Sequence, residues 1–287
     1  MSRVEVIVLS TLLFIAAIAL AYVSNIVWVI VMSSAAIAYG FLSPIVAARR
    51  LYFLAGALPH SALLAAIVSI PLARITPIPN EYFWAILVGL LLTYTVGYMI
   101  HSGIDPDVAT ASFVSFTASA SVISIYFVLT AFPMETNITA IIIGDPLLAS
   151  YSDALFALAV ALASLMLVSL TYCEQVCIGV DRDSVRLTGI NMKFYDIVVF
   201  TLLAITTVAL IKIVGFVLEH VLILLPASIA ITVSSSSREA LFYSVFSSII
   251  ASLGGLYMAI AINTAPAGVT GFILLLLYII AMVIRRR

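Results

Sequence analysis

Long apolar runs, separated by short polar breaks, fill almost the whole chain. Each run is close to the roughly 20 residues that a helix needs to cross a bilayer. Backbone groups in lipid must bond internally, and the runs lack the two-residue alternation of barrel strands, so they predict helices. About ten spans are expected, over residues 6–22, 26–48, 51–73, 82–100, 108–131, 154–172, 194–211, 216–233, 240–262 and 267–284.

The basic residues are divided unevenly between the two predicted membrane faces. With ten spans both chain ends share one face, and ten of the 12 lysines and arginines lie there. Only Arg74 and Lys212 fall on the other face. Because cytosolic loops carry an excess of Lys and Arg, both termini are predicted to be cytosolic.

Composition supports a membrane protein and excludes several other classes. Of the 287 residues, 64% are hydrophobic and 9% are charged, against about 45–50% and about 25% in soluble domains. The net charge of −1 provides no basic field for nucleic acid. Cys173 and Cys177 are too few to close a structural zinc site, so free thiols are expected. With no domain boundary in sight, residues 1–287 are predicted to form one polytopic all-α membrane domain.

The longest polar break on the predicted cytosolic side covers residues 173–193. Asp183 or Ser184 could cap a short helix there, and Gly189 could end it. Such a helix has two interpretations, a simple connector or a docking element for a cytosolic partner.

His60 is the first candidate metal contact. It follows Arg50 by ten residues, which places it near the middle of a roughly 30 Å hydrocarbon core. Pro59 removes a backbone hydrogen bond and can kink the helix, as in the broken helices of transporter sites. The alternative is a neutral histidine bonded to a neighbouring helix.

Glu219, His220 and Asp107 complete the set of candidate metal contacts. Ionisable groups inside a membrane are costly, so they are functional candidates by default. Imidazole and carboxylate together suit zinc, iron or manganese, although adjacent helical residues point about 100° apart. Glu219 could instead pair with Lys212, and Asp107 could instead cap its helix.

Several motifs of enzymes and nucleotide-binding proteins are absent from the chain. It contains no GxxxxGK[ST] phosphate loop, no HExxH and no GxSxG. We therefore expect a transporter without catalytic residues of its own. Its energy would come from an ion gradient or from a partner.

Several stretches, in order, resemble the membrane subunits of ABC importers for zinc, manganese or iron. The resemblance covers roughly residues 30–285. Residues 49–61, RRLYFLAGALPHS, resemble the family's RRLSFLGDALSHS, and residues 181–189 resemble its cytosolic DPExARxxG. Residues 222–227, LILLPA, and 263–268, NTAPAG, resemble its LLILPAA and DxPxG segments.

The resemblance implies a pore subunit in the plasma membrane that imports a divalent metal ion. Two copies would form the pore, separate cytosolic ATPase subunits would supply energy, and an extracytoplasmic binding protein would deliver the metal. The ion would be cargo, with no permanently bound cofactor. Residues 173–193 would dock the ATPase, through Asp181, Asp183, Arg186 and Gly189. Residues 1–24 would be an extra N-terminal span.

One departure from the family concerns the expected metal ligands. The family motif places an aspartate four residues before the histidine, and here that position is Gly56. One hypothesis is that Glu219 replaces the lost carboxylate; the other is a different ligand preference or substrate. The runner-up function is a stand-alone secondary transporter, proton-coupled through Glu219, His220 and His60, which would not need the 181–189 segment.

Overall fold

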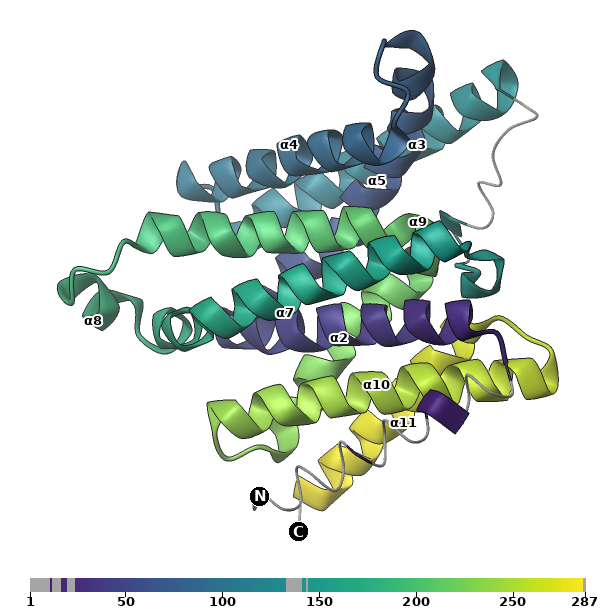
Figure 1. Ribbon diagram of the computed structural model, residues 1–287. Helices are drawn as coiled ribbons and strands as arrows, with labels where there is room; N and C mark the ends of the chain where they lie inside the picture. The colour runs from purple at the N-terminus through teal and green to yellow at the C-terminus, as the bar shows by residue number, and fades with distance from the viewer. Residues whose placement is uncertain (1–10, 12–16, 20–23, 133–140, 143, 286–287) are drawn as a thin grey trace.

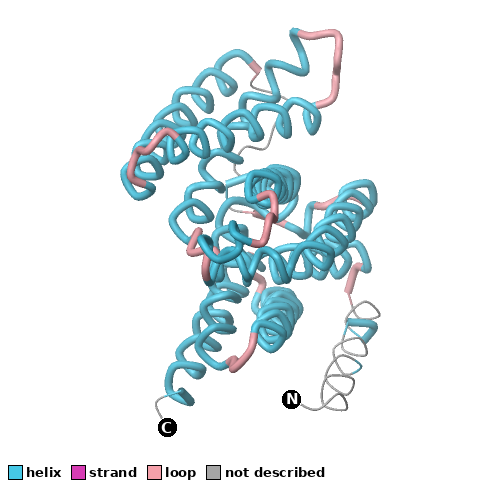
Figure 2. Tube along the Cα trace, turned by 90° about the vertical axis from the view of Figure 1, so that its left-hand side faces the viewer, coloured by secondary structure: helices cyan, strands magenta, loops and turns pink. Residues whose placement is uncertain are grey.

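The computed structural model describes residues 11, 17–19, 24–132, 141–142 and 144–285, and its regular elements are all helices (Figures 1 and 2). Eight of these helices are long and apolar enough to cross a membrane. The predicted all-α membrane class is therefore confirmed. The predicted first span, residues 6–22, falls largely outside the described residues.

The candidate spans agree closely with the apolar runs. They are α2 (Ile26–Ala48), α3 (Tyr52–Ile75), α4 (Glu81–His101), α5 (Pro106–Ala131), α7 (Tyr151–Val180), α9 (Met192–Val233), α10 (Ser237–Ile262) and α11 (Pro266–Arg285). Two short elements, the 3-10 helix η1 (Pro146–Leu148) and α8 (Arg182–Leu187), lie between spans. Polar side chains mark the helix starts: Asn25, Asn80 and Asn191 each accept a backbone N–H of the first turn.

Helix α9 is broken at Gly215, where φ 81° and ψ 162° are not helical. The Tyr39 hydroxyl of α2 lies 3.5 Å from the Thr206 carbonyl oxygen and 3.0 Å from Glu219 Oε1. Thr206 and Glu219 would be about 20 Å apart in a straight helix. Because both lie next to the Tyr39 hydroxyl, the chain turns back at Gly215 (Figure 1). The break predicted between the spans 194–211 and 216–233 is thus present. We call residues 192–214 arm 1 and residues 216–233 arm 2.

Helices α2, α3 and α9 form the centre of the molecule. Helices α4 and α5 pack on α3 at one side of α9, whereas α10 and α11 pack at the other (Figure 1). Helix α7 lies against α2 and α9. The peripheral helices expose apolar side chains, such as Ile123 of α5 at 71%, because their outer faces meet lipid rather than water.

Charged groups gather at the two ends of the bundle. At one end, Arg49 pairs with Asp196, which also binds Arg182 at 2.6 Å. We call this the α8 end, because α8 projects from it (Figure 1). At the other end, Lys212 Nζ lies 2.6 Å from Glu81 Oε2, next to the turn at Gly215; we call this the bend end.

The polar segment predicted over residues 173–193 is partly helical. Helix α7 continues to Val180, so Cys173 and Cys177 belong to its last turns, and both are free. Its 30 residues span about 45 Å, which exceeds a hydrocarbon core of roughly 30 Å. The span predicted from hydropathy ended at residue 172, where the apolar run ends, but the helix itself continues to Val180.

Candidate functional site

The structure brings His60 of α3 together with His220 of arm 2. Their ring centroids lie 5.4 Å apart, and the rings are nearly perpendicular at 85°. Phe216 packs against both rings, with centroids 5.0 Å from His60 and 4.5 Å from His220. The two histidines are partly buried, whereas the third, His101, is exposed at the end of α4. Two imidazoles from different helices therefore share one small site.

Ser43 of α2 holds arm 2 in place for this pairing. Pro226 has no N–H, and its ring opens the helical hydrogen-bond ladder around it. The Ser43 hydroxyl inserts there, donating to the Ile223 carbonyl at 2.9 Å and accepting from the Ala227 N–H at 2.8 Å. These backbone groups would normally bond to each other. A neighbouring helix thus satisfies the opened ladder, as a membrane interior requires.

The His220 ring is flanked by two backbone carbonyls. Its Nδ1 lies 3.2 Å from the Phe216 oxygen, and the Gly56 carbonyl also lies near the ring. A neutral imidazole has one N–H, so it donates to one carbonyl and keeps a lone pair on its other nitrogen. That nitrogen is the type of ligand that transition metals accept.

Gly56 occupies open space beside this pair. A Cβ built on it would meet only Leu224, at an ordinary contact distance of 3.9 Å. Gly56 and His60 lie four residues apart in α3, hence on one face of that helix. The position at which the resemblance expects an aspartate therefore lies on the same face of α3 as His60.

Glu219 points to a different neighbour. It is fully buried, and its Oε1 accepts a hydrogen bond from the Tyr39 hydroxyl of α2 at 3.0 Å. The other oxygen, Oε2, has no hydrogen-bond partner among the residues that the structure describes. The alternative pairing with Lys212 does not form, because Lys212 bonds to Glu81. Glu219 thus faces α2, while the adjacent His220 faces α3.

Asp107 does not join the histidines. It is exposed in the first turn of α5, next to the α4–α5 turn. Its expected capping role falls to Asp105, whose side chain accepts the N–H groups of Asp107 and Val108. Among the residues that the structure describes, no group of three or more His, Cys, Asp or Glu side chains could hold a metal ion.

The predicted docking residues surround the short helix α8. Asp181 caps it, accepting the Ser184 N–H at 3.0 Å and the Ser184 hydroxyl at 2.5 Å. These hydrogen bonds lower the pKa of the Asp181 carboxyl. Asp183 and Arg186 are exposed on α8, and Gly189 ends the segment with φ 80°. The helix predicted from Asp183 or Ser184 therefore exists, with its cap slightly earlier.

Arg49 anchors this region to the bundle. Its side chain is 5% exposed, pairs with Asp196 and donates to Gln175 Oε1 at 2.6 Å. Burial lowers the pKa of the guanidinium, and the nearby Asp196 carboxylate opposes that shift. Arg49 begins the RRLYFLAGALPHS segment that also carries His60, so one stretch connects the α8 end to the histidine site.

Comparison with known proteins decides the family of this helical bundle. A model of the ABC 3 transport family matches residues 19–285. The chain belongs to the ABC 3 transport family. This ABC 3 transport protein is thereby a multi-pass protein of the plasma membrane, in agreement with its eight apolar helices.

Relatives of this ABC 3 transport protein have low sequence identity to it. The manganese transport system membrane protein MntC of Listeria monocytogenes is 23% identical over 244 residues, 84% of each chain. The manganese transport system membrane protein MntB of Synechocystis is 25% identical over 154 residues, 54% of this chain but only 50% of that protein. A structure of PsaBC from Streptococcus pneumoniae in complex with Fab shares the fold, with a TM-score of 0.77, 20% identity and 89% coverage of both chains.

Some features of the site were not expected from the sequence. Tyr39 and Ser43 are single polar residues within an apolar run, and each meets a residue more than 160 positions away in the chain. Phe216 looked like an ordinary apolar residue of a span. The break predicted before it was the one indication that it would lie where two helices converge.

Proposed function

We propose that this chain is the pore-forming permease subunit of an ATP-driven importer that moves a divalent metal ion across the plasma membrane. Its family membership and the manganese transport relatives support this proposal. The observation that carries it is the pairing of His60 and His220 at the centre of the bundle.

His60 and His220 would contact the ion as it passes. Imidazoles suit zinc, iron and related divalent ions, whereas manganese prefers oxygen ligands. Two imidazoles leave most coordination positions to water or to carbonyls such as that of Gly56. Conduction requires a site weak enough to release its ion, which an incomplete ligand set would provide. Glu219 would act at a distance, by fixing arm 2 against α2 through Tyr39.

The ten-span arrangement, with both termini cytosolic, is part of the proposal. The two arms of α9, residues 192–214 and 216–233, each fall within the range of about 17–25 residues that can span a bilayer. With the arms counted separately and residues 6–22 as a further span, the chain would cross ten times. The α8 end carries Arg49, Arg182 and Arg186, so it would face the cytosol.

The α8 region would dock the ATPase. Asp181 and Gly189 hold a short exposed helix, from which Asp183 and Arg186 project. The chain has no phosphate loop, so ATP would be hydrolysed by that partner. A second copy of the chain would complete the pore, and a metal-binding protein would deliver the ion at the bend end.

Metal uptake by proteoliposomes tests this function. The chain is purified with its candidate ATPase and binding protein, and zinc, manganese and iron are offered with and without ATP. We expect uptake that requires ATP and all three components. Uptake by the chain alone, driven by a pH gradient, would instead establish the proton-coupled secondary transporter.

Variants in the same assay test the role of the residues. His60→Ala and His220→Ala should each abolish most uptake, whereas His101→Ala, at an exposed histidine, should not. Glu219→Gln keeps an acceptor for Tyr39 and should retain uptake. A loss in Glu219→Gln as deep as that in His60→Ala would show that the carboxylate itself contacts the metal, in place of the family aspartate.

A further inference from the structure

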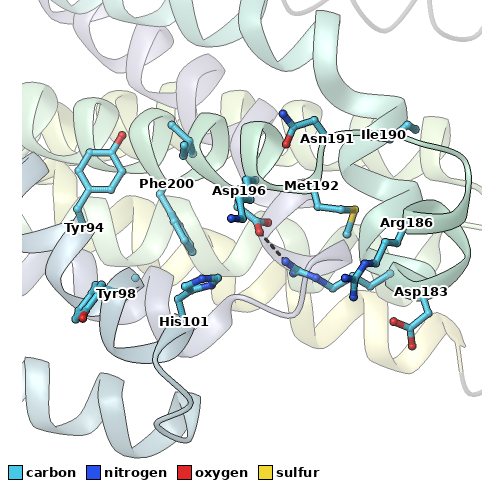
Figure 3. Close-up of a pocket in the computed structure, with 14 residues that line it drawn as sticks. Tyr94, Tyr98, His101, Asp183, Arg186, Ile190, Asn191, Met192, Asp196 and Phe200 are labelled. Carbon is cyan, nitrogen blue, oxygen red and sulfur yellow. Dashed lines mark hydrogen bonds and ion pairs between the residues drawn. The ribbon is translucent and has the colours of Figure 1, made fainter.

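A groove of about 810 Å³ lies at the α8 end, between α4, α8 and the start of α9 (Figure 3). One wall is formed by the spanning helix α4, and the other by the segment that carries α8. The groove therefore joins the lipid-facing surface of the bundle to its charged end.

Aromatic side chains form the wall on the membrane side. Tyr94 and Tyr98 of α4 lie away from Arg186 and Asp183, and Phe200 of α9 lies between Tyr94 and Asp196 (Figure 3). Tyr98 is 72% exposed, on a helix whose outward side chains are mostly apolar. Tyr94 lies about 10 Å along α4 from its end at His101, within a helix apolar and long enough to cross a membrane. A wall on such a helix suits contact with lipid.

Basic side chains form the opposite part of the groove. Arg186 and Lys193 are exposed, and neither forms an ion pair with any residue that the structure describes. Arg182 is already neutralised by Asp196, at 2.6 Å. Asp183 is the remaining carboxylate of the lining, so this part of the groove keeps a net positive charge.

We propose that the groove binds an anionic phospholipid. Its phosphate lies beside Lys193, and its acyl chains run along Tyr94 and Tyr98. Basic pockets between spanning helices on the cytosolic side suit such headgroups. A free phosphate ion would gain nothing from the aromatic wall. The graded lining, charged at one part and aromatic at the other, matches an amphipathic ligand.

Photolabelling in lipid nanodiscs tests the proposal. The full chain is placed in phosphatidylcholine with a small fraction of phosphatidylglycerol that carries a diazirine on its acyl chain. After illumination, labelled peptides are identified by mass spectrometry. We expect label within residues 94–101 and 192–200, displaced by unlabelled phosphatidylglycerol but not by extra phosphatidylcholine.

Charge variants give the matched comparison. Lys193→Gln should lower labelling of these peptides about fivefold, since one basic residue near an anionic surface is worth roughly that factor. Lys193→Arg should restore it. Arg285→Gln removes an exposed cation from the last turn of α11 and should leave labelling unchanged. The competition by unlabelled lipids uses the wild-type chain, so it decides the question even where a variant fails to fold.

Three results would overturn the proposal. Equal labelling of the groove by a phosphatidylcholine probe would show that the headgroup charge is not recognised. Displacement by millimolar inorganic phosphate would show that the site takes the free ion. Loss of labelling in the complete complex with the ATPase would assign the groove to the protein interface.

Discussion

The hydroxyl of Ser43 provides a sharp test of how arm 2 is held in place. It satisfies two backbone groups of α9, the Ile223 carbonyl at 2.9 Å and the Ala227 N–H at 2.8 Å. Ser43→Ala removes both hydrogen bonds and changes little volume. Neither backbone group can turn to water, because Ser43 itself is fully buried.

The expected loss of stability follows from these two bonds. A buried polar group left without a partner costs about 1–3 kcal/mol, so two such groups give an upper range of about 2–6 kcal/mol. The Ala227 N–H and the Ile223 carbonyl are four residues apart, and partial closure of the helix would let them bond weakly to each other. We therefore expect Ser43→Ala to lower the free energy of unfolding by about 2–4 kcal/mol.

Ser61→Ala is the matched control for this variant. Ser61 is equally buried, but its hydroxyl donates only to the Leu58 carbonyl of its own helix, at 2.8 Å. Unfolding of both purified variants in detergent is followed by far-UV circular dichroism. Ser61→Ala should cost about 1 kcal/mol or less. Equal unfolding midpoints for the two variants would refute the idea that Ser43 replaces a helical bond across two helices.

Three further changes test other parts of the fold. Lys212→Met leaves Glu81 without its cation and should lower the free energy of unfolding, as measured by thermal unfolding in detergent. The expected loss is only about 1–2 kcal/mol, because Glu81 is partly exposed to solvent. Gly255→Val drives a side chain into the backbone of Thr270 and should cost about 1–3 kcal/mol by forcing α10 and α11 apart, which the same measurement checks. Asp181→Ala removes the cap of α8 and should speed hydrogen exchange of its amides, whereas Asp181→Asn should not. Because its hydrogen bonds depress the pKa of Asp181, the wild-type protection should persist at neutral pH and weaken as the pH falls through that lowered pKa, where only a neutral acceptor remains.

Much of the architecture could be predicted from the apolar pattern, because the bilayer fixes both the length and the type of a span. The turn at Gly215 could also be predicted, since glycine tolerates the positive φ that reverses the chain. The end of α7 could not. Hydropathy measures contact with lipid, and the last turns of this helix, up to Val180, lie beyond that contact.

The candidate site could be predicted only in part. His60 and His220 stood out because ionisable groups are rare in membrane spans. Their partners depend on the rotation of each helix, which packing between distant segments determines. Lys212 illustrates this: Glu219 is near in sequence, yet Lys212 pairs with Glu81, and this interaction connects α9 to α4.

The divergence of Glu219 and His220 explains how one short segment can serve two purposes. Adjacent helical residues point about 100° apart, so a residue bonded to α2 leaves its neighbour directed elsewhere. The bond from Tyr39 to Glu219 fixes the rotation of arm 2, and this rotation directs His220 toward His60. The turn at Gly215 is required for both contacts, because it returns arm 2 alongside α2 and α3. In the proposed metal site, Glu219 would therefore contribute by setting the direction of the imidazole beside it, without touching the ion.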